Sequence, residues 1–419
     1  MLERILERGN LNEAYKRVKQ NHGVGGVDGM SVMELGEYLA AHKEEILHRI
    51  LEGKYRPKPV LRVEIPKGNG KKRRLGIPTA VDRVIQQAIS QVLSPIYEPK
   101  FAETSYGFRP GRSTHDALRK SVEYVEAGYK YVVDMDLENF FDTVNQSKLV
   151  QLMSEEIKDG RVISLIHKYL RAGMILNNKY EESKEGVPQG SPLSPILANI
   201  LLNELDQKLE ERGHKFVRYA DDVLIFCKSK RAAERTLGNI IPYIEKKLFL
   251  KVNFEKTTVS HIRKIKFLGT AIRVIKGGKA RINVHRKSVE KMKKEIRELT
   301  GRSNGWRREY RKKRLRQYII GWVQYFKLGQ MKTVLKKIDK WMRRRIRAVI
   351  WKQWKRETTK YRNLRKLGIS HTEAYKAANS GKRYWRTVEI RTVQMAMSNN
   401  RLRQAGYTFF TDYYQKITT

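Results

Sequence analysis

The sequence of 419 residues predicts an α+β fold in the first two thirds of the chain, followed by an all-helical and strongly basic segment. Two runs of strand-forming residues carry paired aspartates, at 131–137 and 216–226. From residue 289 onward, apolar residues recur at helical spacing instead. Residues 281–419 hold 39 Lys and Arg against 9 Asp and Glu, together with all six tryptophans. This change in composition predicts a domain boundary near 276–279.

The overall charge and the use of cysteine restrict the class of protein. A formal net charge of +43 indicates a polyanionic partner such as nucleic acid. The single cysteine, Cys227, excludes an internal disulfide and a cysteine-based zinc module, and it favours a reducing compartment. No apolar run reaches membrane-spanning length and the N-terminus lacks a signal-peptide pattern, so we expect a cytoplasmic protein with no membrane partner.

The paired aspartates predict a metal site at the ends of two strands. Tyr219-Ala220-Asp221-Asp222 lies between two apolar runs, which is the pattern of a β-hairpin. Adjacent carboxylates repel each other, and a divalent cation such as Mg²⁺ is the usual reason for them. Asp134 and Asp136 share one face of an upstream strand, an arrangement that suits two-metal phosphoryl transfer. The alternatives are a solvated Asp-Asp turn and, for Asp134, a structural carboxylate.

These motifs resemble a known family. Tyr-Ala-Asp-Asp on a hairpin, with Asp-x-x-x-Phe-Phe-Asp at 136–142, resembles the reverse transcriptases encoded by bacterial group II introns. The resemblance implies a right-hand polymerase with fingers, a split-βαβ palm and a helical thumb, also called domain X. It implies two Mg²⁺ ions, with Mn²⁺ as a possible substitute. The implied catalytic residues are Asp136, Asp221 and Asp222, and the implied metal ligands are Asp136, Leu137, Asp221 and Asp222.

The resemblance covers nearly the whole chain and divides it into four parts. We expect an N-terminal extension at 1–55, fingers at 56–130, a palm with inserted helices at 131–276 and a helical thumb at 277–419. The extension contains a glycine-rich loop at 23–29. By itself this loop is a flexible turn, whereas the resemblance implies that it contacts the template or the incoming strand.

In the fingers, a basic hairpin is expected to bind the nucleotide triphosphate. Residues 60–65 alternate like a strand, and Asn69-Gly70 is a typical hairpin turn. The resemblance assigns phosphate contacts to Lys67 and Arg73. Arg74 is the alternative to Arg73, because a register slip of one residue exchanges the two side chains.

A loop and two helices complete the expected fingers. A helix is predicted at 80–97 from its apolar face. The loop at 105–112 carries Arg109, and the resemblance implies that this loop lies near template and nucleotide. Ser113 or Thr114 is expected to cap the helix that follows.

In the palm, the resemblance names four more substrate-binding residues. Phe141 matches the family's steric gate, which would collide with a ribose 2′-OH; the alternative is that Phe140 or Phe141 is simply core. Gln189 and Gly190 are implied to line the nucleotide pocket. Lys256 is implied to lie near the triphosphate, although a lone lysine is more often a surface residue. A helix is also predicted at about 230–247 and a strand near 250–253.

The basic third is predicted to form helices that each have one apolar and one basic face. Three such helices in series favour a nucleic-acid surface. The apolar spacing indicates that most tryptophans belong to the core. The string at 321–326 matches the family's thumb.

We therefore predict an RNA-directed DNA polymerase encoded by a group II intron, with maturase activity that assists splicing and intron mobility. Its expected partners are an RNA template, a DNA or RNA primer, dNTPs and structured intron RNA. The C-terminal part lacks the features of a homing endonuclease, as expected for a group IIC-like member. The alternatives are an RNA-binding splicing cofactor without polymerase activity, a related reverse transcriptase with a host function such as DNA repair, and a DNA-dependent polymerase.

Overall fold

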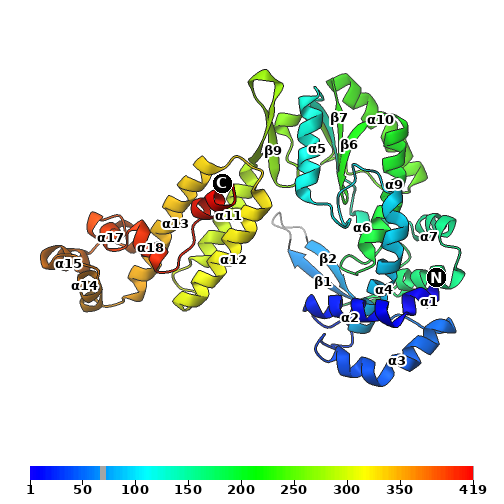
Figure 1. The fold of residues 1–419 in the computed structure, drawn as a ribbon, viewed down its shortest axis with the longest axis horizontal. Helices are drawn as coiled ribbons and strands as arrows, with labels where there is room; N and C mark the ends of the chain where they lie inside the picture. Colours follow the sequence, from blue (N-terminus) through cyan, green and yellow to red (C-terminus); the bar gives the residue numbers. More distant parts are fainter. Residues whose placement is uncertain (67–71, 419) are drawn as a thin grey trace. The chain divides into compact units, whose positions relative to one another are not determined.

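The computed structural model describes residues 1–66 and 72–418, and it divides into two compact units, Met1–Ile262 and Arg263–Thr419 (Figure 1). In the described part of the chain, no helix has both the length and the apolar character that a membrane span requires.

The first unit mixes helices and strands. Its helices are α1 (Leu2–Leu6), α2 (Arg8–Gln20), α3 (Leu35–Leu51), α4 (Ala80–Tyr97), α5 (Thr114–Glu126), α6 (Phe140–Thr143), α7 (Gln146–Glu156), α8 (Gly160–Arg171), α9 (Ser194–Glu211) and α10 (Lys230–Lys247). Its strands are β1 (Val60–Pro66), β2 (Lys72–Ile77), β3 (Tyr131–Met135), β4 (Met174–Leu176), β5 (Lys179–Glu181), β6 (Lys215–Tyr219), β7 (Asp222–Cys227) and β8 (Thr258–His261).

Two four-stranded sheets form the frame of this unit. One has the order β6-β7-β3-β8, and its central strand β3 pairs antiparallel with both β7 and β8. Helices α5, α9 and α10 pack against it, because its strands carry continuous apolar runs that must be buried. The other has the order β2-β1-β4-β5, in which β1 and β4 run parallel. That long-range pairing is not visible in the sequence pattern.

Local capping signals explain where several helices begin. The Ser113 hydroxyl accepts the backbone N–H of Asp116, and the Asp116 carboxylate accepts the backbone N–H of Ser113, so a capping box starts α5. Thr79 caps α4 by accepting from the backbone N–H of Asp82. The predicted helices at 80–97 and 230–247 match α4 and α10.

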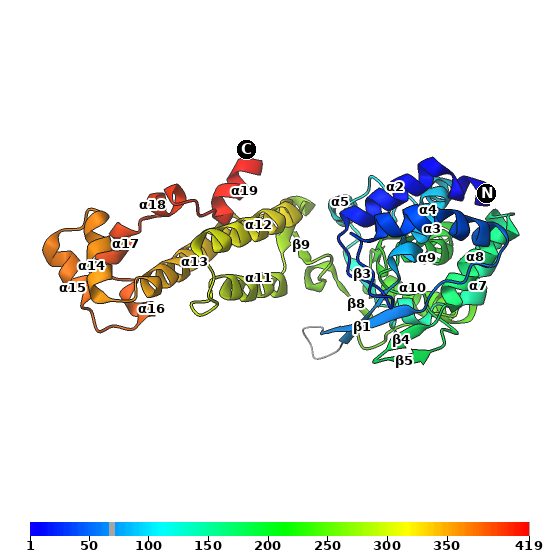
Figure 2. The same ribbon diagram turned by 90° about the horizontal axis from the view of Figure 1, so that it is seen from below.

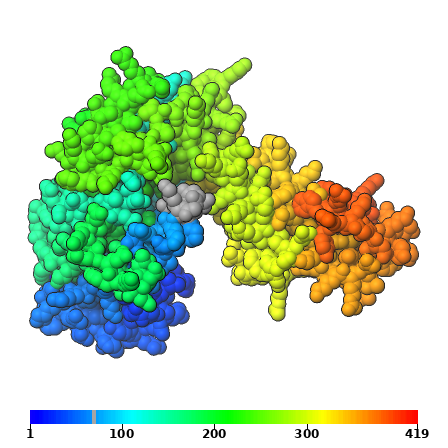
Figure 3. Space-filling view, turned by 180° about the vertical axis from the view of Figure 1, so that it is seen from behind, coloured from blue at the N-terminus to red at the C-terminus, as the bar shows by residue number. Residues whose placement is uncertain are grey.

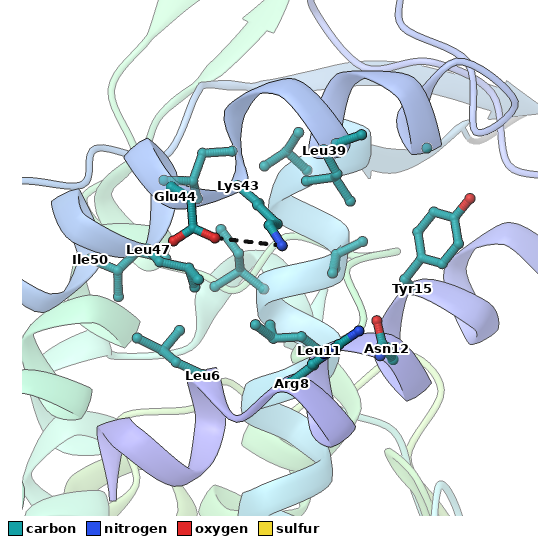
Figure 4. A pocket seen from close by; sticks show the side chains of 16 residues that line it. Leu6, Arg8, Leu11, Asn12, Tyr15, Leu39, Lys43, Glu44, Leu47 and Ile50 are labelled. Carbon is teal, nitrogen blue, oxygen red and sulfur yellow. Dashed lines mark ion pairs between the residues drawn. The ribbon is translucent and has the colours of Figure 1, made fainter.

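The N-terminal helices enclose an apolar pocket of 500 Å³ between α1, α2, α3 and α4. Figure 4 shows Leu6, Leu11, Leu39 and Leu47 around it. The charged side chains of Lys43 and Glu44 also line it and form an ion pair of 3.5 Å.

The second unit is mostly helical. Its strands are β9 (Thr270–Val274) and β10 (Ala280–Val284), which pair antiparallel as a hairpin. Its helices are α11 (Arg286–Leu299), α12 (Arg308–Phe326), α13 (Lys332–Gln353), α14 (Glu357–Lys366), α15 (His371–Ala378), α16 (Tyr384–Thr387), α17 (Arg391–Ala396), α18 (Asn399–Gln404) and α19 (Phe410–Thr418).

One apolar core holds the helices of the second unit together. Figure 2 shows the long helix α13 with α11 beside it, and Figure 3 shows the surface of these helices in yellow to red. The predicted apolar faces of α11, α12 and α13 are buried in this core. Trp351 and Trp354 are buried, while Trp306, Trp322 and Trp341 are partly buried against the core, as the helical spacing predicts. Trp385 differs, since it is 36% exposed.

Two features differ from the sequence prediction. The units divide between Ile262 and Arg263, whereas the charge pattern placed the boundary near 276–279. The reason is that β9 and β10 pair across the predicted boundary and hold both of its sides in the second unit. Residues 250–253 form no regular strand; only Val252 bridges Leu137, in an isolated antiparallel pair.

Candidate active site

Carboxylates from two neighbouring strands meet at one end of the β6-β7-β3-β8 sheet. Met135, the last residue of β3, pairs with Val223 on β7, so the next position along the chain brings Asp136 beside Asp222. The loop between β6 and β7 has only two residues, Ala220 and Asp221, because Tyr219 pairs directly with Asp222. The structure thus places the three aspartates that the sequence predicts as catalytic at the same end of the sheet.

Asp134 lies in the same group of carboxylates. It precedes Asp136 by one strand repeat, so both side chains point to the same face of β3. Burial, together with the negative charges of Asp222 and Asp136, raises the pKa of Asp134 to about 6. These carboxylates therefore repel one another, which is the electrostatic condition that a bound cation relieves.

A lysine side chain supplies positive charge at this site. Lys256 Nζ lies 2.7 Å from Asp136 Oδ2 in an ion pair. The backbone N–H of Asp136 donates to Thr257 Oγ1 at 3.2 Å, which fixes the segment that carries the lysine. The resemblance implied that Lys256 lies near the triphosphate, and the structure places its ammonium on the Asp136 carboxylate.

The predicted metal ligands fit a hard divalent cation by their chemistry. Asp136, Asp221 and Asp222 offer only oxygen donors, which Mg²⁺ prefers, and Leu137 could offer only its backbone carbonyl because its side chain is a hydrocarbon. Among the residues that the structure describes, no three His, Cys, Asp or Glu side chains are already arranged around one metal position. The Lys256 ammonium on Asp136 shows that this carboxylate attracts a cation.

A buried ion pair between β6 and α9 supports the β6–β7 hairpin. The side chains of Arg218 on β6 and Asp206 on α9 are both 0% exposed, and Arg218 Nε donates to both Asp206 carboxylate oxygens at 2.8 and 2.9 Å. Arg218 Nη1 also donates to the carbonyl of Ala220 at 3.1 Å and to Asn199 Oδ1 at 2.9 Å. One guanidinium therefore ties the loop residue Ala220 to helix α9.

Gly107 lies directly against the hairpin loop. Asn199 Nδ2 donates to the Gly107 carbonyl at 2.9 Å, and the backbone N–H of Tyr106 donates to the Arg218 carbonyl at 2.9 Å. A Cβ atom on Gly107 would lie 2.1 Å from the backbone nitrogen of Ala220, far inside van der Waals contact. Ala220 has a φ of +58°, so this loop already holds a non-glycine residue in a left-handed conformation.

We expect Gly107→Ala to shift the hairpin loop and lower the rate of the reaction that Asp221 serves. A displacement of about 1 Å at a reacting group reduces rate by roughly 100-fold. The measurement is steady-state primer extension, with thermal unfolding to show that the variant is folded. Gly111→Ala is the matched control in the same loop, because a Cβ there meets no atom within 4 Å, although its φ of +69° adds backbone strain. Equal losses in the two variants would contradict the steric argument.

A cavity of 660 Å³ in the first unit contains four of the predicted substrate-binding residues. Arg73, Phe141, Gln189 and Gly190 all line it, and so does Gly23 of the glycine-rich loop. Arg73 Nε donates to Gln189 Oε1 at 3.0 Å. Gly190 has a φ of +118°, and a Cβ on it would lie 2.9 Å from the Gly76 carbonyl oxygen, so no larger residue fits without a shift.

The two candidate arginines of β2 face different cavities. Arg73 lines the cavity that also contains Gly190, and Arg74 lines a neighbouring cavity of 440 Å³ next to Gly186. This separation follows from strand alternation. Lys67, the other predicted phosphate contact, lies outside the described residues.

The two phenylalanines of α6 differ in burial and in what they contact. Phe140 is 3% exposed and belongs to the core, whereas Phe141 lines both cavities. Their rings meet edge to face, with centroids 5.1 Å apart. Phe141 thus lines the cavities and contacts Phe140, while its role as a steric gate stays a prediction.

The position of Arg109 does not support its predicted contact with substrate. Its side chain is buried, pairs with Glu98 at 2.8 Å and donates to the carbonyls of Ala102 and Ser105 at 2.6 and 2.9 Å. The guanidinium is therefore occupied inside its own loop. Arg109 shapes the segment that carries Gly107, and we assign it a structural role in place of a binding role.

The supporting residues Arg218, Asp206 and Asn199 were missed in the sequence. A signal was available, because Arg218 stands inside an apolar strand directly before the Tyr-Ala-Asp-Asp string, and a buried arginine needs an acidic partner. The partner itself, twelve residues upstream on a helix, could not be identified from spacing alone.

Comparisons with known proteins agree with this geometry. Residues 65–272 match the family model described as reverse transcriptase (RNA-dependent DNA polymerase). Residues 289–368 match the model described as group II intron, maturase-specific domain. The first match contains all of the aspartates described above, and the second lies within the helical unit.

Individual relatives share part of their length with this chain. Protein YkfC of Escherichia coli (strain K12) is 34% identical over 275 residues, which cover 57% of this chain and 72% of that protein. The group II intron-encoded protein LtrA of Lactococcus lactis subsp. cremoris is 33% identical over 301 residues, which cover 56% of this chain and 50% of LtrA. This chain therefore matches about half the length of LtrA.

Solved structures are more distant. A chain of the partial Cas6-RT-Cas1–Cas2 complex has a TM-score of 0.37 and 24% sequence identity, over 58% of this chain and 42% of that chain. Apo telomerase from Candida tropicalis has a TM-score of 0.40 and 18% identity, over 52% and 53%.

Proposed function

The chain belongs to the reverse transcriptases that carry a group II intron maturase domain, and from this membership we propose how its site is used. The matched domains support RNA-directed DNA polymerase and maturase function, and the fold is that of a right-hand polymerase followed by a helical domain. They also imply binding of an RNA template and of intron RNA. Since the chain matches half of LtrA, the activity of the whole protein is part of the proposal.

We propose that the protein transfers nucleotides from dNTPs to the 3′-OH of a DNA or RNA primer that is paired to an RNA template. The observation that carries this proposal is the meeting of Asp136 with the Asp221-Asp222 hairpin, in the same unit as the cavity lined by Arg73 and Gln189. Because the chain matches the group II intron maturase-specific domain, we propose that the protein also binds its own intron RNA and supports splicing and intron mobility.

Reverse transcriptases use divalent metal ions, and we propose two Mg²⁺ ions held by Asp136, Asp221 and Asp222, with the Leu137 carbonyl as a further ligand. When bound, these ions would favour attack of the primer 3′-OH on the α-phosphate and stabilise the departing pyrophosphate. Mn²⁺ is a possible substitute, since it prefers the same oxygen donors.

The other side chains bind and orient the substrate in this proposal. Arg73 would contact the triphosphate, and its hydrogen bond to Gln189 holds the guanidinium toward the cavity. Lys256 would exchange its ion pair with Asp136 for the triphosphate once a cation occupies that carboxylate. Phe141 would exclude a ribose 2′-OH and so select deoxynucleotides. Gly190 would line the nucleotide pocket, where the lack of a Cβ lets its own backbone lie close to Gly76.

The experiment that tests this function is primer extension by the full chain on an RNA template, with dNTPs and Mg²⁺. We expect extension that stops when EDTA removes the metal and returns when Mg²⁺ or Mn²⁺ is restored, because the carboxylates repel one another without a cation. Ca²⁺ serves as the control cation, since its larger and more flexible coordination does not match Mg²⁺.

Two other outcomes would replace the proposal. Tight binding of structured RNA without any extension would favour a splicing cofactor that has no polymerase activity. Extension on a DNA template with none on RNA would favour a DNA-dependent polymerase.

A further inference from the structure

A small cavity in the second unit is built from arginines and tryptophans. It has a volume of 290 Å³ and lies between the end of α11, helix α13 and the short helix α16. Trp341 and Trp385 line it, together with Arg297, Arg302 and Arg345. The remaining lining residues, Thr300 and Ala348, are small, and no acidic side chain contributes to the wall.

The positive charge in this cavity is not neutralised by the protein. Across the described residues, Arg297, Arg302 and Arg345 form no ion pair with a carboxylate within 4.0 Å. The neighbouring Arg344 does pair, with Glu389 at 2.7 Å, which shows that an acidic residue is available nearby but is used elsewhere. Three guanidinium groups without counter-ions in one cavity form a site for an anion.

The three arginines do not have the same role. Arg345 Nε donates to Thr300 Oγ1 at 2.6 Å, and its Nη2 donates to the Arg297 carbonyl at 3.0 Å, so it caps the C-terminus of α11. Arg297 and Arg302 are exposed, and within the described part of the chain neither guanidinium donates a hydrogen bond. These two side chains are therefore the ones available to a ligand.

The tryptophans add aromatic surface to this charge. Trp385 is 36% exposed, in contrast to the buried Trp351 on α13. Arg344 lies 3.8 Å from the centre of the Trp385 ring and donates to the Trp385 carbonyl at 2.9 Å, so the indole is held in place although it is exposed. Arg302 lies over the Tyr384 ring at 5.3 Å. Arg297 likewise lies over the Trp341 ring at 5.6 Å. An exposed indole held beside guanidinium groups that have no carboxylate partner is the combination that binds an unpaired nucleobase and its phosphate.

We propose that this cavity binds one unpaired nucleotide of an RNA strand, with its base stacked on Trp385 and its phosphate bound by Arg297 and Arg302. The volume lies at the lower limit of ligand pockets, about 300 Å³, so it suits a single nucleotide and excludes a duplex. The net charge of +30 over residues 281–419 favours RNA over an acidic peptide as the source of the phosphate. This inference rests on the proposed binding of intron RNA by the maturase domain.

The test compares the binding of two RNA probes by the full chain. One probe is a hairpin with a loop of unpaired nucleotides, and the other is a blunt duplex of the same length. We expect Trp385→Ala and Arg302→Ala each to weaken binding of the loop probe by about tenfold, the size of one lost base-stacking contact, and to change duplex binding by less than about twofold. Arg316→Ala is the matched control, since it removes one charge from an exposed position on α12.

The outcomes separate this inference from the proposed function. Equal losses of affinity for the loop and duplex probes would overturn the proposal, and so would a loss in Arg316→Ala as large as in Arg302→Ala. Either result would show that the cavity contributes only general positive charge. Unchanged binding of the loop probe in both cavity variants would also overturn it. Primer extension is measured in parallel. If the wild-type chain fails to extend primers while Trp385→Ala and Arg302→Ala selectively weaken loop binding, the polymerase proposal is refuted and the cavity assignment stands.

Discussion

Asp221→Asn is expected to abolish primer extension while leaving RNA binding unchanged. The substitution keeps the size of the side chain and removes one negative charge at the turn between β6 and β7. A metal-bound carboxylate contributes several kcal/mol to the transition state, and a loss of about 4 kcal/mol corresponds to roughly a thousandfold in rate. The measurement is single-turnover extension at saturating Mg²⁺, beside a binding titration with the same primer–template.

The matched control for this variant is Glu255→Gln, which removes one negative charge from an exposed side chain next to Lys256. It should retain nearly full activity, because the Glu255 carboxylate is not one of those that meet at the end of β3. If Asp221→Asn extended primers at a rate close to that of Glu255→Gln, the proposed metal site would be wrong. If Asp221→Asn lost RNA binding as well, the loss of extension would not identify a catalytic role.

Asp206→Asn is expected to destabilise the first unit strongly. The Arg218 guanidinium would remain buried without a counter-charge, and removing one partner of a buried ion pair costs about 3–5 kcal/mol. The measurement is the free energy of unfolding from urea titration, followed by a probe in the first unit. A control at an exposed pair of the same unit, Glu13→Gln, removes the charge from a contact of 2.9 Å with Arg17 and should change stability by less than about 1 kcal/mol.

A double variant separates the stability of this pair from its effect on the hairpin. Asp206→Leu with Arg218→Met removes both buried charges, and such replacements are often neutral or stabilising. The Ala220 carbonyl and Asn199 would still lose their donor, so extension should stay low even when stability returns. Recovery of both stability and extension would show that Arg218 does not position the hairpin.

Local sequence signals were sufficient to predict many elements of the first unit. The bounds of α4 and α10 follow from capping residues and one apolar face, which are both properties of neighbouring positions. The paired aspartates could be assigned to one site because strand alternation fixes the side of the sheet on which Asp134 and Asp136 lie. The placement of Arg73 and Arg74 in two different cavities also follows from alternation, but it needed the observed register of β2.

Contacts between distant segments could not be predicted in this way. The parallel pairing of β1 with β4 brings together residues more than a hundred positions apart, and no periodicity encodes it. Arg109 illustrates the same limit, since its residue type and its loop suggested phosphate binding while its partner Glu98 and nearby carbonyls were invisible. The compact units divide before the change in charge composition, because that change lies inside a hairpin that the backbone pairing holds together.

The dependence of the hairpin on α9 has a consequence for synthesis of the protein. The hydrogen bond from Asn199 to the Gly107 carbonyl joins residues 92 positions apart. At roughly 5–20 residues per second, the ribosome needs about 5–18 seconds to make the intervening chain. During that interval the loop around Gly107 exists without α9, the helix that holds it in position. A nascent chain that stalls before α9 therefore cannot assemble its active site, however much of the fingers it has already folded.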